Sequence, residues 1–167
     1  GIVVEYGNSV YDSRDNSNNI IETSTNKLIL GCQNSVIPDN ITSIGDDAFL
    51  NSGLKGKLNI PDGVTYIGIN AFRFCSDLTG DLVIPNSVTY VGKAAFWECT
   101  GFDGTLTLSE NMDTIYDYSF ASYDSVMGFK DKIVIPSKVK YIGNVAFQNC
   151  SKLTEVQFAD IDNSQLT

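Results

Sequence analysis

The sequence predicts a β-rich solenoid, a right-handed stack of about five similar coils. A motif recurs five times at intervals of 23 to 27 residues, with a phenylalanine at the same place in each copy: Phe49, Phe72, Phe96, Phe120 and Phe147. Within a copy, apolar residues alternate with polar ones, which is typical of strands rather than helices. A unit this short cannot bury its apolar side alone, so neighbouring copies are expected to stack.

The two most similar copies, residues 58–80 and 82–104, show what the motif contains. They read LNIPDGVTYIGINAFRFCSDLTG and LVIPNSVTYVGKAAFWECTGFDG, and their proline, glycine, phenylalanine and cysteine are each 24 residues apart. The fourth copy keeps its phenylalanine but has Ser109 in place of the proline and Tyr116 in place of the glycine, and it is three residues longer. We therefore expect the fourth coil to be irregular.

Residues 1–35 precede the repeat and are expected to form a capping hairpin. The apolar segments 20–22 and 27–30 flank the turn-forming sequence Thr-Ser-Thr-Asn. A terminal coil needs such a cap because its core face is otherwise exposed. The chain starts at Gly1 without a methionine or a signal-type apolar segment, which suggests a processed chain or a vector-derived glycine.

Each coil is expected to contain two short strands joined at the proline, then a glycine and a short helical turn. The glycine suits either a positive φ or a close approach of the next coil. The phenylalanine lies on the helical turn and fills the core. A second core column is expected beside the phenylalanines, made of Ile44, Ile67, Val91, Ile115 and Ile142.

The array is expected to occupy residues 36–159, followed by a polar tail at 160–167. Residues 155–159 resemble the first strand of a sixth coil. Either a cap is improvised there, or the natural chain continues.

Composition and charge exclude several classes of function. No run approaches 18 apolar residues, so no membrane span is expected in this chain. Eleven basic and twenty acidic side chains give a net charge of −9, which repels nucleic acid backbones. The absence of histidine removes the commonest general base and metal ligand. We therefore expect no enzymatic activity, no catalytic residues, no metal site and no cofactor.

Three of the four cysteines, Cys75, Cys99 and Cys150, share one repeat position. The favoured interpretation is that they are buried thiols packing as small apolar residues. A Cys75–Cys99 disulfide is the alternative in an oxidising exterior. A spacing of 24 residues does not fit the paired cysteines of zinc sites. Cys32 is out of register and is expected to pack under the cap.

The acidic clusters are expected to be solvated rather than functional. Residues 12–16 resemble a calcium loop, but Arg14 occupies its third position and no glutamate stands at the twelfth. The pairs Asp46-Asp47 and Asp160/Asp162 are interpreted as coil edges, because no apolar pocket or companion acid is apparent near them.

Four aromatic residues are the candidate binding residues. Tyr66, Tyr90 and Tyr141 share one repeat position and are expected to point outward in a row. Trp97, the only tryptophan, follows Phe96 and is also expected to point outward. Aromatic residues are enriched at interfaces, so this strip is a candidate surface for a protein or a glycan. The alternative is that tyrosines simply favour strands and cover the sheet.

The pattern LxIPxxVTxIGxxAFxxC resembles the BspA-type leucine-rich repeat. Three copies carry the resemblance: LNIPDGVTYIGINAFRFC, LVIPNSVTYVGKAAFWEC and IVIPSKVKYIGNVAFQNC. It covers residues 36–158, and the segment before them resembles the capping segment of such arrays. The resemblance implies a secreted or cell-surface protein of host-associated bacteria that adheres to host matrix proteins or to other cells. It supplies no catalytic residues to carry over.

We therefore expect a non-enzymatic protein-binding or adhesion scaffold whose partners are host or bacterial surface proteins, or glycans. The alternative is a structural spacer or stalk segment of a larger surface protein. An enzymatic function would require a carboxylate pair in a deep pocket, which a repetitive rod does not obviously offer.

Overall fold

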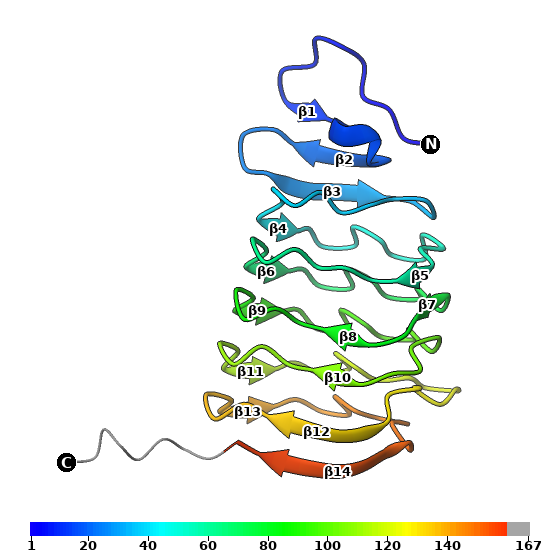
Figure 1. Cartoon of the computed structure of the whole chain (residues 1–167), viewed down its shortest axis with the longest axis vertical. Helices are drawn as coiled ribbons and strands as arrows, with labels where there is room; N and C mark the ends of the chain where they lie inside the picture. The colour runs from blue at the N-terminus through cyan, green and yellow to red at the C-terminus, as the bar shows by residue number, and fades with distance from the viewer. Residues whose placement is uncertain (160–167) are drawn as a thin grey trace, which may run out of the picture.

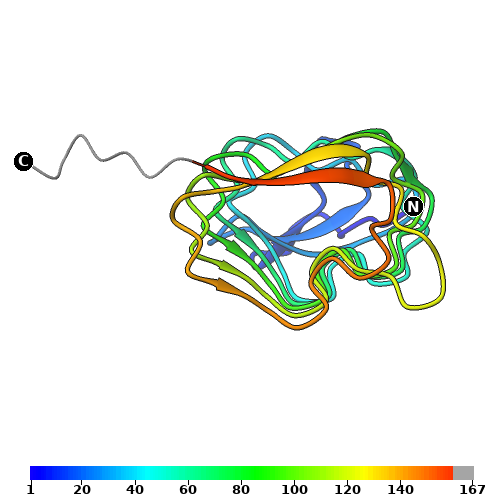
Figure 2. The same cartoon turned by 90° about the horizontal axis from the view of Figure 1, so that it is seen from below.

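The protein is a rod of stacked coils, described here by a computed structural model of residues 1–159 (Figure 1). The expected tail at 160–167, with Asp160 and Asp162, lies outside the described residues. Seen along the rod, successive coils superimpose around a common centre (Figure 2). The fold class expected from the repeat, a β-rich solenoid of about five coils, is confirmed.

The N-terminal end of the rod carries the expected hairpin. Strands β2 (Asn19–Glu22) and β3 (Lys27–Gly31) form an antiparallel pair. Strand β1 (Tyr11–Asp12) pairs antiparallel with the other edge of β2, and a short 3-10 helix, η1 (Arg14–Asn16), connects β1 to β2. Strand β3 then pairs in parallel with the first repeat strand, with Leu28 opposite Ile44. The hairpin therefore hides the core face of the first coil.

One side of the rod is built from the second strand of each coil, which we call the second-strand seam. It contains β4 (Ser43–Ile44), β6 (Tyr66–Ile67), β9 (Tyr90–Val91), β11 (Thr114–Ile115) and β13 (Tyr141–Ile142). Strands β4, β6 and β9 continue the sheet of the hairpin in parallel register. The inward residue of each strand from β4 to β11 is fully buried, so the aliphatic column is formed as expected as far as Ile115.

The other strands lie on the opposite side, in the first-strand seam. Strand β5 (Gly56–Lys57) pairs with β7 (Leu78–Thr79), β8 (Leu82–Val83) with β10 (Leu106–Thr107), and β12 (Asp131–Ile135) with β14 (Leu153–Phe158), all in parallel. The first strand expected of a sixth coil is thus present as β14. It begins two residues earlier than the sequence suggests.

The segment around each phenylalanine is not helical, so the expected short helical turns are wrong. Residues two before and two after the phenylalanine have left-handed backbone in several coils, as at Asp47 and Asn51 on either side of Phe49. The amides of these three residues donate to carbonyl groups of the next coil, at 2.7 to 2.9 Å, instead of to the preceding turn. Stacking therefore takes the hydrogen bonds that a helix would need.

The glycine after each second strand is required by close approach, not by positive φ. A Cβ on Gly68 would lie 2.5 Å from the backbone nitrogen of Asp46, and one on Gly92 would lie 2.6 Å from that of Ile69. Neither glycine has a positive φ. The neighbour is the preceding coil, whose backbone passes where a side chain would begin.

Tyr116 occupies this glycine position in the fourth coil, and the second-strand seam breaks there. No strand pairing joins β9 to β11 within residues 1–159, although β11 pairs with β13 beyond it. A Cβ has no room at the spacing that Gly92 permits, which accounts for the loss of strand pairing between the third and fourth coils on this side. The irregularity of the fourth copy is therefore a local loss of pairing.

The phenylalanine column is continuous through all five coils. Successive rings from Phe49 to Phe147 are stacked within 10° of parallel, with centroids 5.1 to 5.7 Å apart. The first four rings are fully buried, and the last packs against the core at its edge. Phe102 and Phe129 form a second stacked pair beside this column. Phenylalanines of the column and of this pair are the six largest fully buried side chains in residues 1–159.

The cysteines are free thiols that form hydrogen bonds between coils. Cys75, Cys99 and Cys150 each donate to the carbonyl of the phenylalanine in the coil before, at 3.0 to 3.3 Å. Burial raises the pKa of all three thiols, that of Cys150 to about 12. Cys32 is half-buried under the hairpin, where its thiol lies 3.6 Å from the Asn18 carbonyl. These contacts agree with the favoured interpretation of packed thiols.

Removing one central ring should weaken the whole stack. Phe96→Ala is expected to lower the free energy of unfolding by about 3 to 5 kcal/mol, because it leaves a cavity between two stacked rings. Val83→Ala is the matched control, since Val83 is 51% exposed in the same coil. Urea denaturation measures both, and equal losses for the two variants would contradict the column.

Thiol reactivity should separate the folded state from the unfolded one. Cys75 and Cys99 are expected to resist a disulfide-exchange reagent at pH 8 while the protein is folded, because burial holds them protonated and out of reach. All four cysteines should react in urea. A titre of two thiols in the unfolded protein would indicate the Cys75–Cys99 disulfide instead.

Candidate binding surface

The outward side of the second-strand seam carries a short tyrosine ladder, which we define as Tyr66, Tyr90 and Tyr116. The rings of Tyr66 and Tyr90 are stacked, 4.7 Å between centroids and 3° from parallel. Parallel register between β6 and β9 puts these residues directly opposite each other. Tyr116 adds a third ring, tilted by 53° and 5.2 Å from Tyr90.

The first coil anchors this ladder through Asp46. The Tyr66 hydroxyl donates to Asp46 Oδ1 at 3.1 Å, and the backbone amide of Ile69 donates to the same oxygen at 2.9 Å. Burial, and then this hydrogen bond, raises the pKa of Tyr66 to about 12. The half-buried Tyr90 has its pKa raised mainly by burial. Both phenols therefore stay neutral at physiological pH.

Tyr141 points outward as expected but does not join the ladder. It is 53% exposed, and its register partner in the fourth coil is Thr114, which has no ring. The threonine separates it from the rings of the third coil. Of the three tyrosines expected in one row, the structure brings two together.

A second aromatic group surrounds the tryptophan, and we call Arg73, Phe74, Trp97 and Tyr118 the Trp97 cluster. The Trp97 ring stacks on Phe74 of the preceding coil at 6.3 Å and on Tyr118 of the following coil at 5.1 Å. It points outward as expected, but it is only half-buried rather than fully exposed because both its neighbours cover it.

Arg73 completes the cluster through its guanidinium group. The guanidinium carbon lies 4.1 Å from the Trp97 ring centroid and 4.8 Å from that of Phe74. Such packing attracts the cation to the ring electrons. The Arg73 Nε has no hydrogen-bond partner, and neither ion pair found in residues 1–159 involves this side chain. The two rings thus hold the guanidinium group in place, and no carboxylate of the described residues neutralises its charge.

The two groups meet through the fourth coil. Tyr116 contacts the ladder and Tyr118 contacts Trp97, while Asp117 between them lies 3.6 Å from the Lys93 ammonium. The Lys93 ammonium also lies 5.6 Å from the Tyr118 ring. Three consecutive coils thus contribute to one aromatic surface carrying two cations.

Sequence reasoning missed most of the Trp97 cluster. Arg73 has the same repeat position as Trp97, so comparison of the repeats could have predicted that it lies beside the Trp97 ring. Phe74 and Tyr118 stand at other repeat positions and reach the ring diagonally. Phe74 also has a left-handed backbone, φ 62°, at a position where the first and fifth coils use asparagine. The sequence alone did not indicate that Phe74 has a left-handed backbone and an exposed ring at this position.

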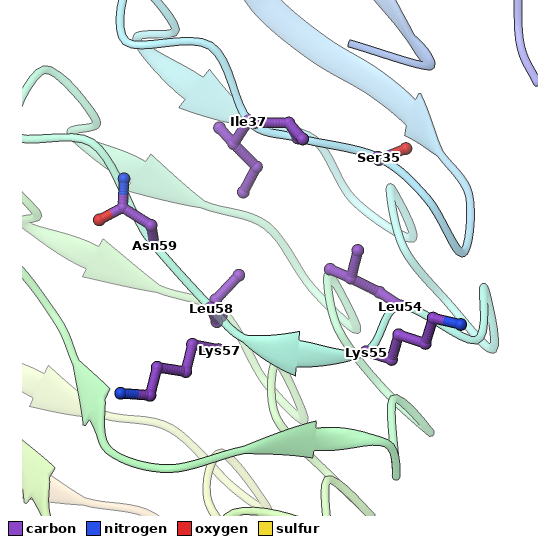
Figure 3. Close-up of a pocket in the computed structure, with 8 residues that line it drawn as sticks. Ser35, Ile37, Leu54, Lys55, Lys57, Leu58 and Asn59 are labelled. Atoms are coloured by element: carbon purple, nitrogen blue, oxygen red, sulfur yellow. The ribbon is translucent and has the colours of Figure 1, made fainter.

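Two shallow pockets lie in the first-strand seam. One of about 120 Å³ separates the segment around Ile37 from the segment around Leu58, with Lys55 and Lys57 at its rim (Figure 3). Another of about 460 Å³ lies on the outward side between β10 and β12, where the seam is not paired, and is lined by Thr107, Val134 and Pro136. Small-molecule sites are usually 300 to 1,000 Å³ and enclosed by apolar side chains. The first pocket is smaller than this range. The second lies within it but follows the unpaired seam between β10 and β12, so both are explained as gaps between coils.

The acidic clusters have structural partners. Asp46 and Asp47 are exposed as expected, but their carboxylates accept hydrogen bonds from the next coil, so they are not merely solvated. Arg14 forms an ion pair with Asp12, and its hydrogen bond lowers the pKa of that carboxyl. In the segment that resembles a calcium loop, the Asp12 carboxylate is therefore paired with Arg14 of the same segment.

The raised pKa of Tyr66 predicts a loss of stability at high pH. Below pH 10 the phenol is neutral in both folded and unfolded chains; between pH 10 and about 12 only the unfolded chain releases the proton, which favours unfolding. Tyr66→Ser should reduce this loss, whereas Tyr123→Ser should not. Urea midpoints measured across this pH range test the expectation, which fails if the two variants behave alike.

Comparison with known proteins agrees with the solenoid. The family profile described as BspA type leucine rich repeat region matches residues 19–130 and 127–165, in six copies. Comparison with curated proteins gave no match. No helix within residues 1–159 is long and apolar enough to cross a membrane.

One solved bacterial structure supports the fold, and two others are similar over most of this chain. The pneumococcal vaccine antigen PcpA aligns over 96% of this chain with a TM-score of 0.55 and 19% identity, and the chain spans 33% of that antigen. A leucine-rich repeat protein from Bacteroides capillosus aligns over 96% of this chain and 100% of its own, with a TM-score of 0.46 and 21% identity. A leucine rich cell surface protein from Faecalibacterium prausnitzii aligns over 98% and 58%, with a TM-score of 0.42 and 22% identity. Because the profile covers most of the sequence and the coils stack as its repeats require, the chain belongs to the BspA type leucine rich repeat family.

Proposed function

We propose that this protein is a non-enzymatic binding scaffold, secreted or displayed at the cell surface, that contacts host or bacterial surface proteins. The contact surface joins the tyrosine ladder to the Trp97 cluster. The observation that supports it most is Arg73, whose guanidinium lies against aromatic rings without an ion-pair partner in residues 1–159. Aromatic residues and arginine are the side chains most enriched at binding hot spots.

The geometry of the rings favours a polypeptide over a glycan. Sugars stack on open ring faces, but Tyr66 and Tyr90 cover each other, and Trp97 lies between Phe74 and Tyr118. Stacking closes the ring faces that meet each other, which favours contact through ring edges and phenolic hydroxyl groups, beside the half-buried Arg73. A polypeptide offers apolar side chains for the edges, and carbonyl or carboxylate groups for the donors.

Surface display and adhesion rest on the family resemblance. The repeats extend a continuous outer surface along the rod, as binding solenoids do. An acidic chain of net charge −9 is a poor ligand for nucleic acids, which leaves proteins as the partners that fit best.

A second candidate function is that of a spacer or stalk that presents another domain. It is favoured by the shape, because stacked coils form a rod whose length grows with each repeat (Figure 1). The chain also spans only 33% of the pneumococcal antigen. In this case the aromatic side chains would only cover the second-strand seam and would bind no partner.

Substitutions borrowed from other coils test the surface without disturbing the fold. Trp97→Gln takes its residue from the fifth coil, Tyr90→Thr from the fourth, and Phe74→Asn from the first. We expect the combined variant to bind its partner at least about tenfold more weakly, because hot-spot residues contribute about 2 kcal/mol each. Surface plasmon resonance against host matrix proteins and bacterial surface proteins measures the change.

Tyr123→Ser is the matched control, because Tyr123 is 67% exposed and makes none of the aromatic contacts of the surface. It should bind as the unchanged protein does. Saturable binding that the combined variant retains would reject this surface. If the folded protein shows no saturable binding to any of these proteins, the spacer function is favoured.

A further inference from the structure

Tyr116 places a second phenol beside Tyr90, across the junction between the third and fourth coils. It stands two residues beyond Thr114, the repeat equivalent of Tyr90, and therefore on the same outward side of the rod. The two half-buried rings have centroids 5.2 Å apart and planes tilted by 53°. At this junction strands β9 and β11 follow each other in the stack but are not paired (Figure 1). Two phenols thus lie side by side where strand pairing is missing.

Neighbouring phenols can be joined by oxidation. Each phenol loses one electron and one proton, which gives two phenoxyl radicals whose unpaired electrons are shared with the ring carbons next to the oxygen. A carbon–carbon bond forms between one such carbon of each ring. The hydrogen on each bonded carbon moves to the phenolic oxygen, and both rings become aromatic again. Hydrogen peroxide takes up the two electrons and two protons and becomes two water molecules.

The backbone separation decides which neighbour Tyr90 can couple with. The new bond places both rings edge to edge between the two Cβ atoms, so these atoms must lie well apart. Tyr66 is directly opposite Tyr90 in parallel register, where Cβ atoms are about 4.8 Å apart. Tyr116 is the diagonal neighbour, and two further residues of strand bring the separation to about 8 Å. The stacked pair with Tyr66 is therefore too close, whereas the tilted pair with Tyr116 has room for the bond.

We propose that Tyr90 and Tyr116 form a site of oxidative cross-linking, at which a peroxidase and hydrogen peroxide join the two rings through a carbon–carbon bond. The bond adds a covalent tie to the junction that has lost its strand pairing on this side. Because the folded stack holds both rings in place, coupling within one chain is favoured over coupling between chains. The cross-link does not depend on the proposed binding function.

Treatment of dilute protein with a haem peroxidase and hydrogen peroxide tests the coupling. The monomer should lose the mass of two hydrogen atoms and gain the fluorescence of coupled tyrosines. Trypsin places the three phenols of the tyrosine ladder on different peptides, residues 58–73, 74–93 and 94–130. Mass spectrometry should find the second peptide linked to the third. A link between the first and second peptides instead would overturn the proposal.

Conservative variants identify the two rings. Tyr116→Phe keeps the ring but removes the phenol, and should lower the yield of the link at least about tenfold, because coupling depends on the phenol held beside Tyr90. Tyr66→Phe is the matched control and should leave the yield unchanged. A link that survives Tyr116→Phe would assign the coupling to Tyr118 or Tyr123 and overturn the proposal. So would a treated protein that forms dimers between chains, through exposed tyrosines such as Tyr123, but no internal link.

Urea shows how the link and the fold depend on each other. The isolated cross-linked monomer should unfold at a higher urea concentration than the untreated protein, because the link constrains the unfolded chain. Oxidation in concentrated urea should not give the selective link, since only the stacked coils hold the two rings together. An unchanged unfolding midpoint would refute the tie, and a link formed equally well in urea would refute its dependence on the fold.

Discussion

The structure depends on the stacking of backbone on backbone at the spacing of a parallel β-sheet. This constraint places each side chain against its own counterparts 23 to 27 residues away, so a favourable residue is favourable in every coil. It explains the ring column, the aliphatic column and the thiols that reach the carbonyl of the coil before. It also explains why a glycine recurs after the second strand of most coils, since Gly68 and Gly92 stand where the backbones of two coils are in contact.

The fourth coil shows what happens when the constraint is relaxed. Tyr116 replaces the glycine, and the strand pairing between β9 and β11 is lost. On the opposite side, β10 and β12 are not paired either, and a shallow pocket opens between them. The same substitution supplies a ring that contacts Tyr90, and Tyr118 two residues later reaches Trp97. The degenerate repeat is thus the place where the aromatic surface is assembled, at a local cost in pairing.

The repeat period made the solenoid, its two core columns and the capping hairpin predictable, because vertical stacking follows directly from sequence spacing. The local conformation was less accessible. The Ala-Phe segment resembles a helical turn, but its amides bond to the next coil, and asparagines such as Asn51 were the only hint of left-handed backbone. At the candidate site, Tyr66 and Tyr90 followed from their shared position, whereas Phe74 and Tyr118 reach Trp97 diagonally. Tyr141 points outward as its position predicts, but Thr114 separates it from the other two rings.

The alternating loss of pairing around the fourth coil leaves that coil joined to both of its neighbours. That coil lacks one seam toward the third coil and the opposite seam toward the fifth, while the phenylalanine stack runs unbroken through both junctions. The amides of the phenylalanine segments also bond across both junctions, as in Phe96 N to Ser119 O and Phe120 N to Ala146 O. Each junction therefore keeps two of its three lines of backbone contact, and the missing line changes side from one face of the fourth coil to the other.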